Sequence, residues 1–166
     1  SIPFVANATL IGDTVHIAQN YPVIGSEHFP VDIVVGSGTE FSWRYFVDVD
    51  AGSVEITFSN VSFIDVPAGG NNFNGPMISG LNDSSGNPLV GFSNFQTDSG
   101  FNPGNILYGS DFIGFNFDSL SFSEGNYIYV DLTFENTQND VPEPTTLALL
   151  GLGLLGLAVR SRKASV

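Results

Sequence analysis

The stretch that decides the fold is EFSWRYFVDVD (residues 40–50), in which apolar and polar side chains alternate almost throughout. Phe41, Trp43, Tyr45, Val47 and Val49 fall on one face of this segment, and mostly polar residues fall on the other. A period of two is typical of a β-strand that turns one face toward a core. The sequence therefore predicts one strand here, with Trp43 and Tyr45 packed into the core.

A second strand is expected directly after the first. The turn DAGS (50–53) leads into VEITFSN (54–60), where every second residue is apolar. Two alternating segments joined by so short a turn predict a β-hairpin. The apolar phase then slips to Val61 and Phe63, which indicates a bulge or bend near Asn60.

Further short strands are expected on both sides of this hairpin. They fall at residues 9–17, 31–35, 77–81, 89–95 and 111–117, between loops rich in Gly, Asn, Ser and Pro. A second hairpin is expected to join residues 120–122 to 127–135 through SEGN (123–126), with Ile128, Val130, Leu132 and Phe134 facing inward. Strand spacing of this kind over residues 9–135 predicts an all-β body, an antiparallel β-sandwich of jelly-roll or immunoglobulin-like topology.

Composition excludes several classes of function. The 166 residues include no Cys, which excludes disulfides, thiolate zinc sites and cysteine nucleophiles. Seventeen acids face four bases, and three of those bases lie in the last seven residues. The chain before Val141 thus has sixteen acids and a single base, Arg44, a net charge of −15. Such a surface repels phosphate backbones and argues against nucleic acid as a partner.

Residues 1–8 have the features of a secretory signal remnant. Ala6 and Ala8 give the small-x-small form of a signal-peptidase site, and they follow the apolar fragment 2–5. Cleavage at this site would leave Thr9 as the first residue of the mature protein.

The other end of the chain predicts a membrane segment. Residues 136–144 (NTQNDVPEP) show no periodicity and contain two prolines, as expected of a linker. Residues 147–159 are all apolar or Gly. As a helix these span about 20 Å, and flanking residues extend that to about 28 Å against a hydrocarbon core of about 30 Å. We therefore expect a transmembrane helix with a basic tail at 145–166, whose cations keep the C-terminus in the cytoplasm and place the body outside. The alternative, a buried core helix, is disfavoured because the run has no polar face.

The chain ends in three parts whose order is informative: a Pro-Glu-Pro element, a short apolar segment and a basic cluster. The residues are Pro142, Glu143 and Pro144, then 147–159, then Arg160, Arg162 and Lys163. This arrangement resembles the PEP-CTERM sorting signal of exported bacterial proteins. The resemblance implies an exosortase as processing enzyme, an inner-membrane anchor before processing, and a final place at the surface or outside of a Gram-negative bacterium. Less specifically, TLIGDTV (9–15) and FNGPMISGL (73–81) resemble segments of small PEP-CTERM proteins, a likeness that implies no activity.

The body offers few candidates for catalysis. His16 and His28 are the only histidines, and neither lies in a G-x-S-x-G or H-E-x-x-H context. We expect both to be surface or structural residues, and we expect no catalytic residue, no cofactor and no enzymatic activity. Trp43 and Tyr45 would stack on sugars only if they were exposed.

Acidic side chains raise the separate question of calcium. Asp48 and Asp50 share one strand face, whereas Asp65 and Asp83 lie in loops. Carboxylates at the rim of a sandwich could hold Ca²⁺, but the NDSSGN loop (82–87) lacks the EF-hand spacing. Solvated acids are the favoured interpretation.

These observations together predict an exported surface or matrix protein, associated with exopolysaccharide or biofilm and without catalysis of its own. Its expected partners are the exosortase and the inner membrane, with exopolysaccharide as a further candidate. The alternative is a carbohydrate- or Ca²⁺-binding β-sandwich module of the exopolysaccharide matrix, which requires exposed aromatic side chains or a carboxylate cage.

Overall fold

The computed structural model describes residues 9–63 and 72–135. The chain divides into two units, Ser1–Glu135 and Asn136–Val166. The signal-peptidase site at Ala6 and Ala8, the linker at 136–144 and the membrane helix at 145–166 lie outside the described residues and stay predictions. Within the two described ranges, no helix has the length and apolar character needed to span a membrane.

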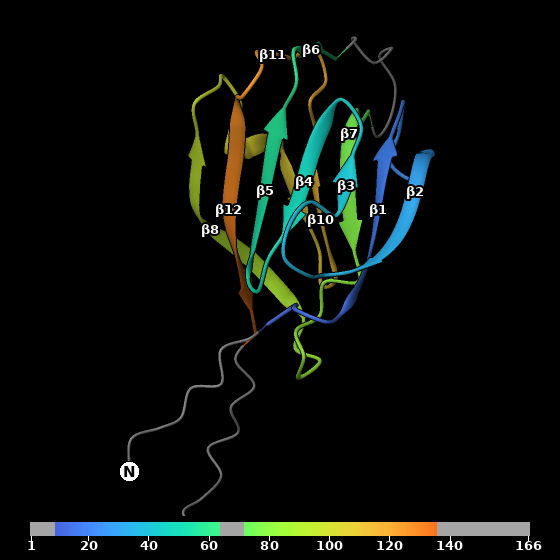
Figure 1. The fold of residues 1–166 in the computed structure, drawn as a ribbon, viewed down its shortest axis with the longest axis vertical. Helices are drawn as coiled ribbons and strands as arrows, with labels where there is room; N and C mark the ends of the chain where they lie inside the picture. Colours follow the sequence, from blue (N-terminus) through green and yellow to red (C-terminus); the bar gives the residue numbers. More distant parts are fainter. Residues whose placement is uncertain (1–8, 64–71, 136–166) are drawn as a thin grey trace, which may run out of the picture. The chain divides into compact units, whose positions relative to one another are not determined.

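The described chain is all-β, and its strands form two five-stranded antiparallel sheets and one two-stranded sheet (Figure 1). In spatial order the first sheet consists of β2 (Glu27–Val34), β1 (Thr14–Asn20), β7 (Gly75–Ser79), β10 (Phe112–Phe115) and β9 (Ile106–Tyr108). The second consists of β3 (Phe41–Ser42), β4 (Tyr45–Val49), β5 (Ser53–Phe58), β12 (Tyr127–Phe134) and β8 (Leu89–Thr97). The small sheet pairs β6 (Val61–Ser62) with β11 (Ser121–Phe122), and η1 (Pro103–Asn105) is a single 3₁₀ turn. The predicted antiparallel all-β body is confirmed.

Alternation along the strands places one face of each large sheet in a shared core. Val47 of β4 and Ile17 of β1 come from different sheets, are both fully buried, and belong to one hydrophobic cluster. Toward one end the core is aromatic: Phe58 and Phe122 stack with ring centroids 3.7 Å apart, and Phe117 packs edge-on against both. Each fully buried Val, Ile or Phe contributes about 1.5–3 kcal/mol to folding. The two sheets are therefore held face to face as a sandwich.

The hairpin predicted around residues 50–53 is confirmed. β4 pairs antiparallel with β5, from Tyr45 opposite Phe58 to Val49 opposite Val54. After Phe58 the chain leaves this sheet, and β6 pairs with β11 instead. The phase slip read from the sequence near Asn60 thus marks the point where the chain changes sheets.

Residues 40–50 do not form one strand, contrary to the prediction. β3 ends at Ser42 and pairs antiparallel with β4, so the chain reverses through Trp43 and Arg44. The Trp43 N–H donates to the carbonyl of Tyr45 (3.0 Å), which closes the reversal. Because the turn contains none of the usual Gly, Pro, Asn or Asp, the alternation pattern conceals it.

The second predicted hairpin is wrong in its pairing. β11 has only two residues and pairs with β6, whereas β12 lies between β5 and β8. The turn at 123–126 does form, but the Asn126 carbonyl accepts the N–H of Phe58 (2.8 Å) and starts the ladder with β5. The predicted inward-facing residues of β12 are confirmed: Ile128, Val130 and Leu132 are buried, and Phe134 packs against the core.

Strand boundaries elsewhere differ from the sequence-based ranges for local reasons. β1 begins only at Thr14, because Gly12 adopts a left-handed φ of 90° and a turn precedes the strand. β2 begins at Glu27 and includes Pro30, which is tolerated because β2 is an edge strand. The three-residue strand β9 was not predicted, since so short a segment carries no clear period.

Candidate functional site

A pocket of about 350 Å³ opens where edge strand β2 of one large sheet faces the β3–β4 turn of the other. The described residues of its lining, called here the aromatic pocket, are Gln19, Tyr21, His28, Phe29, Trp43, Arg44, Ser62, Phe63 and Asn74. Segments far apart in the sequence thus meet at one side of the sandwich, where β2 forms the right-hand edge in Figure 1. The volume is at the small end of the roughly 300–1,000 Å³ found for small-molecule pockets.

Aromatic side chains form the walls of this pocket. The rings of Phe29 and Trp43 lie 5.6 Å apart between centroids, and Trp43 meets Tyr45 edge-on at 5.9 Å. Phe29 is 60% exposed and Trp43 is 38% exposed, whereas Tyr45 is fully buried beneath them. The expectation that Trp43 packs into the core is therefore wrong, and the same expectation for Tyr45 is confirmed. Trp43 escapes burial because it sits in the β3–β4 reversal rather than in a strand.

The position of Phe29 depends on a distorted edge strand. β1 and β2 are in register at Ile17 opposite Val31 and again at Gln19 opposite His28, so β2 has one extra residue between these pairs. This β-bulge includes Phe29, whose φ of 54° lies in the left-handed region that bulky side chains rarely adopt. Strain of this kind clusters at binding and catalytic sites, and here it aims an aromatic ring at Trp43.

Below the aromatic walls lies a buried polar network. The Tyr45 hydroxyl donates to Gln19 Oε1 at 2.6 Å, and Gln19 Nε2 donates to Asn74 Oδ1 at 3.0 Å. Gln19 is 3% exposed and Asn74 is 4% exposed. Burial raises the pKa of Tyr45 well above its usual range, so its hydroxyl remains a donor at any physiological pH. Buried, mutually bonded amides of this type give a pocket a rigid floor.

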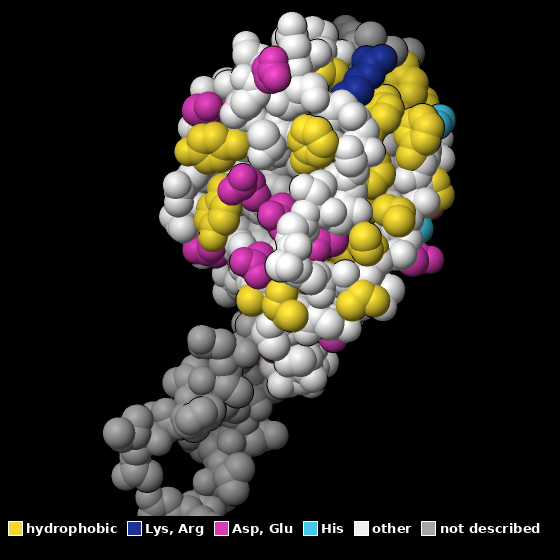
Figure 2. Space-filling model, in the orientation of Figure 1, with side chains coloured by type: hydrophobic (Ala, Val, Ile, Leu, Met, Phe, Trp, Pro, Cys, Tyr) yellow, Lys and Arg dark blue, Asp and Glu magenta, His cyan; other side chains and the backbone are white. Residues whose placement is uncertain are grey.

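The pocket is also the place where the acidic surface is interrupted. Arg44 is the only Lys or Arg among residues 9–135, and its guanidinium carbon lies 5.2 Å from the centroid of the Trp43 ring. Figure 2 shows this basic side chain, in dark blue, beside a band of hydrophobic side chains. No Asp or Glu occurs among the nine lining residues, although residues 9–135 include fifteen acids.

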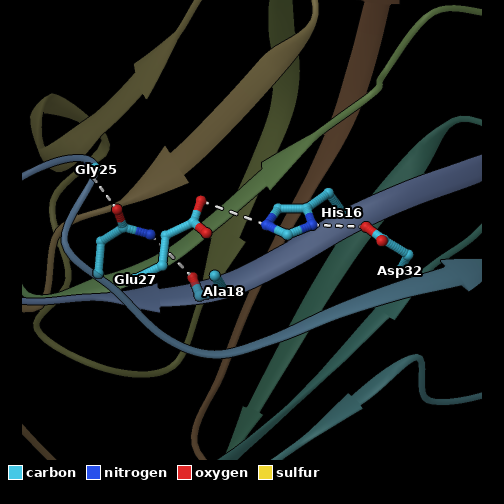
Figure 3. A network of polar contacts seen from close by, with 6 residues as sticks. His16, Ala18, Gly25, Glu27 and Asp32 are labelled. Atoms are coloured by element: carbon cyan, nitrogen blue, oxygen red, sulfur yellow. Dashed lines mark hydrogen bonds and ion pairs between the residues drawn. The ribbon is translucent and has the colours of Figure 1, made fainter.

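His28 and His16 both occupy surface positions, as predicted. In the pocket wall, His28 Nε2 lies 3.1 Å from the carbonyl of Tyr21, to which it donates. Figure 3 shows His16 between two carboxylates: Nδ1 lies 2.6 Å from Asp32 Oδ1 and Nε2 lies 3.3 Å from Glu27 Oε1. The hydrogen bond to Asp32 is the main cause that raises the pKa of His16; Glu27 adds to the shift and partial burial opposes it. This cluster links β1 to β2 and has a structural role.

The acids considered for calcium do not assemble a cage. In the ranges 9–63 and 72–135, no group of three or more His, Asp or Glu side chains is placed to hold a metal ion. Asp48 is partly buried beside Asp50, and burial followed by that neighbouring charge raises the pKa of Asp48. Asp83 accepts hydrogen bonds from the backbone of Ser85 (2.9 Å) and Asn87 (2.8 Å). Burial acts to raise the pKa of Asp83, but these bonds and one from the Asn87 side chain lower it, and the carboxylate organises its own loop. Asp65 lies outside the described residues.

Sequence reasoning missed most of the pocket. Gln19 and Asn74 lie in segments without a motif, and Phe29 was assigned to a loop. Only Arg44 stood out, as the sole base of the body, yet nothing in the sequence linked it to the aromatic residues. The predicted sorting residues Pro142, Glu143, Pro144, Arg160, Arg162 and Lys163, like the cleavage residues Ala6 and Ala8, lie outside the described residues.

Comparison with known proteins identifies the C-terminal segment. Neither the curated proteins nor the solved structures include a match to the chain. The family model described as the PEP-CTERM protein-sorting motif matches residues 140–163, which contain the Pro-Glu-Pro element and the basic cluster. Signals of this family are processed by an exosortase and direct export and sorting through the membrane. Residues 140–163 are therefore a PEP-CTERM sorting motif, which supports export of the chain and its sorting by an exosortase.

Proposed function

We propose that this protein is a non-catalytic component of the extracellular matrix, and that its body binds a carbohydrate residue in the aromatic pocket. The observation that carries the proposal is the pairing of exposed Phe29 and Trp43 above the buried amides of Gln19 and Asn74. The alternative derived from the sequence, a carbohydrate-binding module, required an exposed aromatic side chain, and Trp43 is one.

The two layers of the pocket match the two kinds of surface that a sugar ring presents. One face of a pyranose consists of C–H groups, which pack favourably on aromatic rings such as Phe29 and Trp43. The ring edge carries hydroxyls, which both donate and accept hydrogen bonds, and the exposed hydroxyl of Ser62 in the lining can do the same above the floor of Gln19 and Asn74. The volume of about 350 Å³ suits a small ligand or one unit of a longer chain.

The same lining supports binding rather than glycoside hydrolysis. Glycosidases use a pair of carboxyl groups on either side of the scissile bond, and the nine residues of the aromatic pocket include none. The Nε2 of His28, the histidine among these nine residues, is engaged with the backbone carbonyl of Tyr21. We therefore propose that the pocket binds its carbohydrate ligand and releases it without cleaving it.

Binding is tested with the full chain in mild detergent, by titration calorimetry against a panel of oligosaccharides. Trp43→Ala is expected to weaken binding of any sugar that the wild type binds by about thirtyfold, the scale of about 2 kcal/mol for an interface hot spot. Phe46→Ala is the matched control: Phe46 is 41% exposed, close to the 38% of Trp43, but lies outside the pocket. Equal effects of the two substitutions would contradict the proposal.

Delivery to the matrix is tested separately in cells. Replacing Glu143 together with its flanking prolines, or deleting residues 145–166, is expected to abolish C-terminal processing and to change the fraction in which the protein is recovered. Intact-mass spectrometry of the recovered protein locates both processed ends. Unchanged processing and location after either change would count against sorting through this signal.

A further inference from the structure

We infer that the aromatic pocket selects a sugar residue that carries a carboxylate, and that Arg44 recognises this group. The inference rests on the proposed carbohydrate-binding function and adds the chemical class of the ligand. It draws on three observations: the lack of an ion pair at Arg44 within the described ranges, the charge of the pocket lining, and the contact of the Arg44 guanidinium with Trp43.

The first observation is that Arg44 makes no ion pair or side-chain hydrogen bond with any residue in the described ranges. The two ion pairs found there both belong to His16, which contacts Glu27 and Asp32. The described ranges contain fourteen acids for this single base, so a structural partner among them would be easy to provide. Arg44 is exposed, lines the pocket and contacts the Trp43 ring instead.

The second observation is that the part of the pocket lining formed by described residues has no negative charge, although the body is strongly negative. All nine lining residues are neutral or basic, and the lining holds both Arg44 and His28. An anionic ligand is repelled by the body as a whole, but that repulsion is screened over about 8 Å at physiological salt. Among the described lining residues the permanent charge is the cation of Arg44, which favours a ligand whose negative charge lies at this one point.

The third observation is that Trp43 orients the guanidinium. A cation 5.2 Å from an aromatic centroid is attracted to the ring face, which limits the conformations of the Arg44 side chain. An oriented guanidinium can donate two parallel N–H bonds to a carboxylate. In a uronic acid the carboxylate projects from the ring edge, so the ring can stack on Phe29 and Trp43 while the carboxylate reaches Arg44.

A carboxylate fits this site better than a phosphate. A phosphate monoester carries up to two negative charges and three acceptor oxygens, which proteins usually match with several cations or backbone N–H groups. Arg44 is the one permanent cation here, and it balances a single negative charge. The ligand is therefore a uronic acid unit rather than a phosphorylated sugar.

The experiment compares an oligogalacturonide with its methyl ester, in which each carboxylate is replaced by a neutral ester group on the same sugar chain. Full-length protein in mild detergent is titrated with each by calorimetry, as wild type, Arg44→Gln and Arg44→Lys. Wild type is expected to bind the acid at least tenfold more tightly than the ester. Arg44→Gln is expected to remove this difference between acid and ester, and Arg44→Lys is expected to retain part of it.

The outcomes separate this inference from the proposed function. Equal affinity of the wild type for acid and ester, or a preference for the acid that survives Arg44→Gln, would overturn the inference and leave carbohydrate binding intact. Failure to bind either ligand, or any neutral oligosaccharide, would overturn both. Because Arg44 is exposed, Arg44→Gln is expected to keep the wild-type urea unfolding midpoint, which shows that the variant is folded when its binding is measured.

Discussion

Replacing Tyr45 with Phe removes one buried hydroxyl and leaves the ring in place. In the wild-type protein this hydroxyl donates to Gln19 Oε1 at 2.6 Å, and the two residues are 0% and 3% exposed. In the variant the Gln19 oxygen loses its partner at a site that water hardly reaches. A buried acceptor left without its hydrogen bond costs about 1–3 kcal/mol, so we expect the free energy of unfolding to fall by that amount.

The matched control is Tyr129→Phe. The Tyr129 hydroxyl also donates at 2.6 Å, to Asp131 Oδ1, but Tyr129 and Asp131 are only partly buried on β12. Water can replace the lost donor there, and surface substitutions of this kind change stability by about 0.5 kcal/mol or less. The two variants lose the same hydroxyl and differ in its burial and in its acceptor, which is an amide oxygen for Tyr45 and a carboxylate oxygen for Tyr129.

Urea unfolding followed by tryptophan fluorescence measures both variants. Trp43 is the only tryptophan in the chain, so the signal arises in the β-sandwich, and its ring lies 5.9 Å from that of Tyr45. The Tyr45→Phe midpoint is expected to move to lower urea with an unchanged slope. If Tyr45→Phe were no more destabilising than Tyr129→Phe, the hydrogen bond from Tyr45 to Gln19 would not stabilise the floor of the pocket.

Two further predictions concern the frame around the pocket. Gly75→Ala is expected to lower the free energy of unfolding by about 1–3 kcal/mol, because a Cβ at this position would overlap the backbone carbonyl of Phe115 in β10. The control is Gly52→Ala, because no atom lies within 4 Å of a Cβ at Gly52. Equal urea midpoints of the two variants would contradict the close approach of Gly75 to Phe115. His16 has a raised pKa in the folded state, so its contribution to stability is full below its unfolded value of about 6.5 and is lost as pH rises through the folded pKa. The difference in unfolding midpoint between wild type and His16→Gln is therefore expected to shrink from pH 5.5 to pH 8.5, and a constant difference would exclude protonation of His16 as the cause.

The strands that were predicted correctly are those whose burial pattern is local. Alternation in residues 54–58 places Val54, Ile56 and Phe58 in the core, as found, because a strand with one buried face must repeat every two residues. The pairing of β11 with β6 could not be predicted in this way, since it depends on which distant segment offers a free edge. Two-residue strands leave no period to detect, so topology had to come from the structure.

Trp43 and Phe29 show why the pocket itself was beyond prediction. In sequence, Trp43 continues the apolar phase of Phe41 and Tyr45, and only the reversal at Arg44 turns it outward. Phe29 is exposed because β2 has one extra residue relative to β1, a mismatch defined by two strands and not by either alone. Periodicity describes regular strands, whereas both walls of the pocket come from places where a strand departs from regularity.

The two irregularities are the bulge in β2 and the reversal that follows β3. β2 and β3 are each the edge strand of their sheet, and residues of both irregularities line the same pocket. An edge strand exposes unpaired N–H and C=O groups, and proteins protect such edges with bulges, prolines, charges or very short strands. β2 has a bulge, Pro30 and Asp32, and β3 consists of two residues. The bulge that protects β2 also aims Phe29 at the pocket, and the reversal that shortens β3 presents Trp43 and Arg44 to it. An exported protein whose residues before Val141 carry a net charge of −15 can therefore display aromatic side chains at a sheet edge without inviting strand pairing between copies, because the distortions that build the site also block the edge.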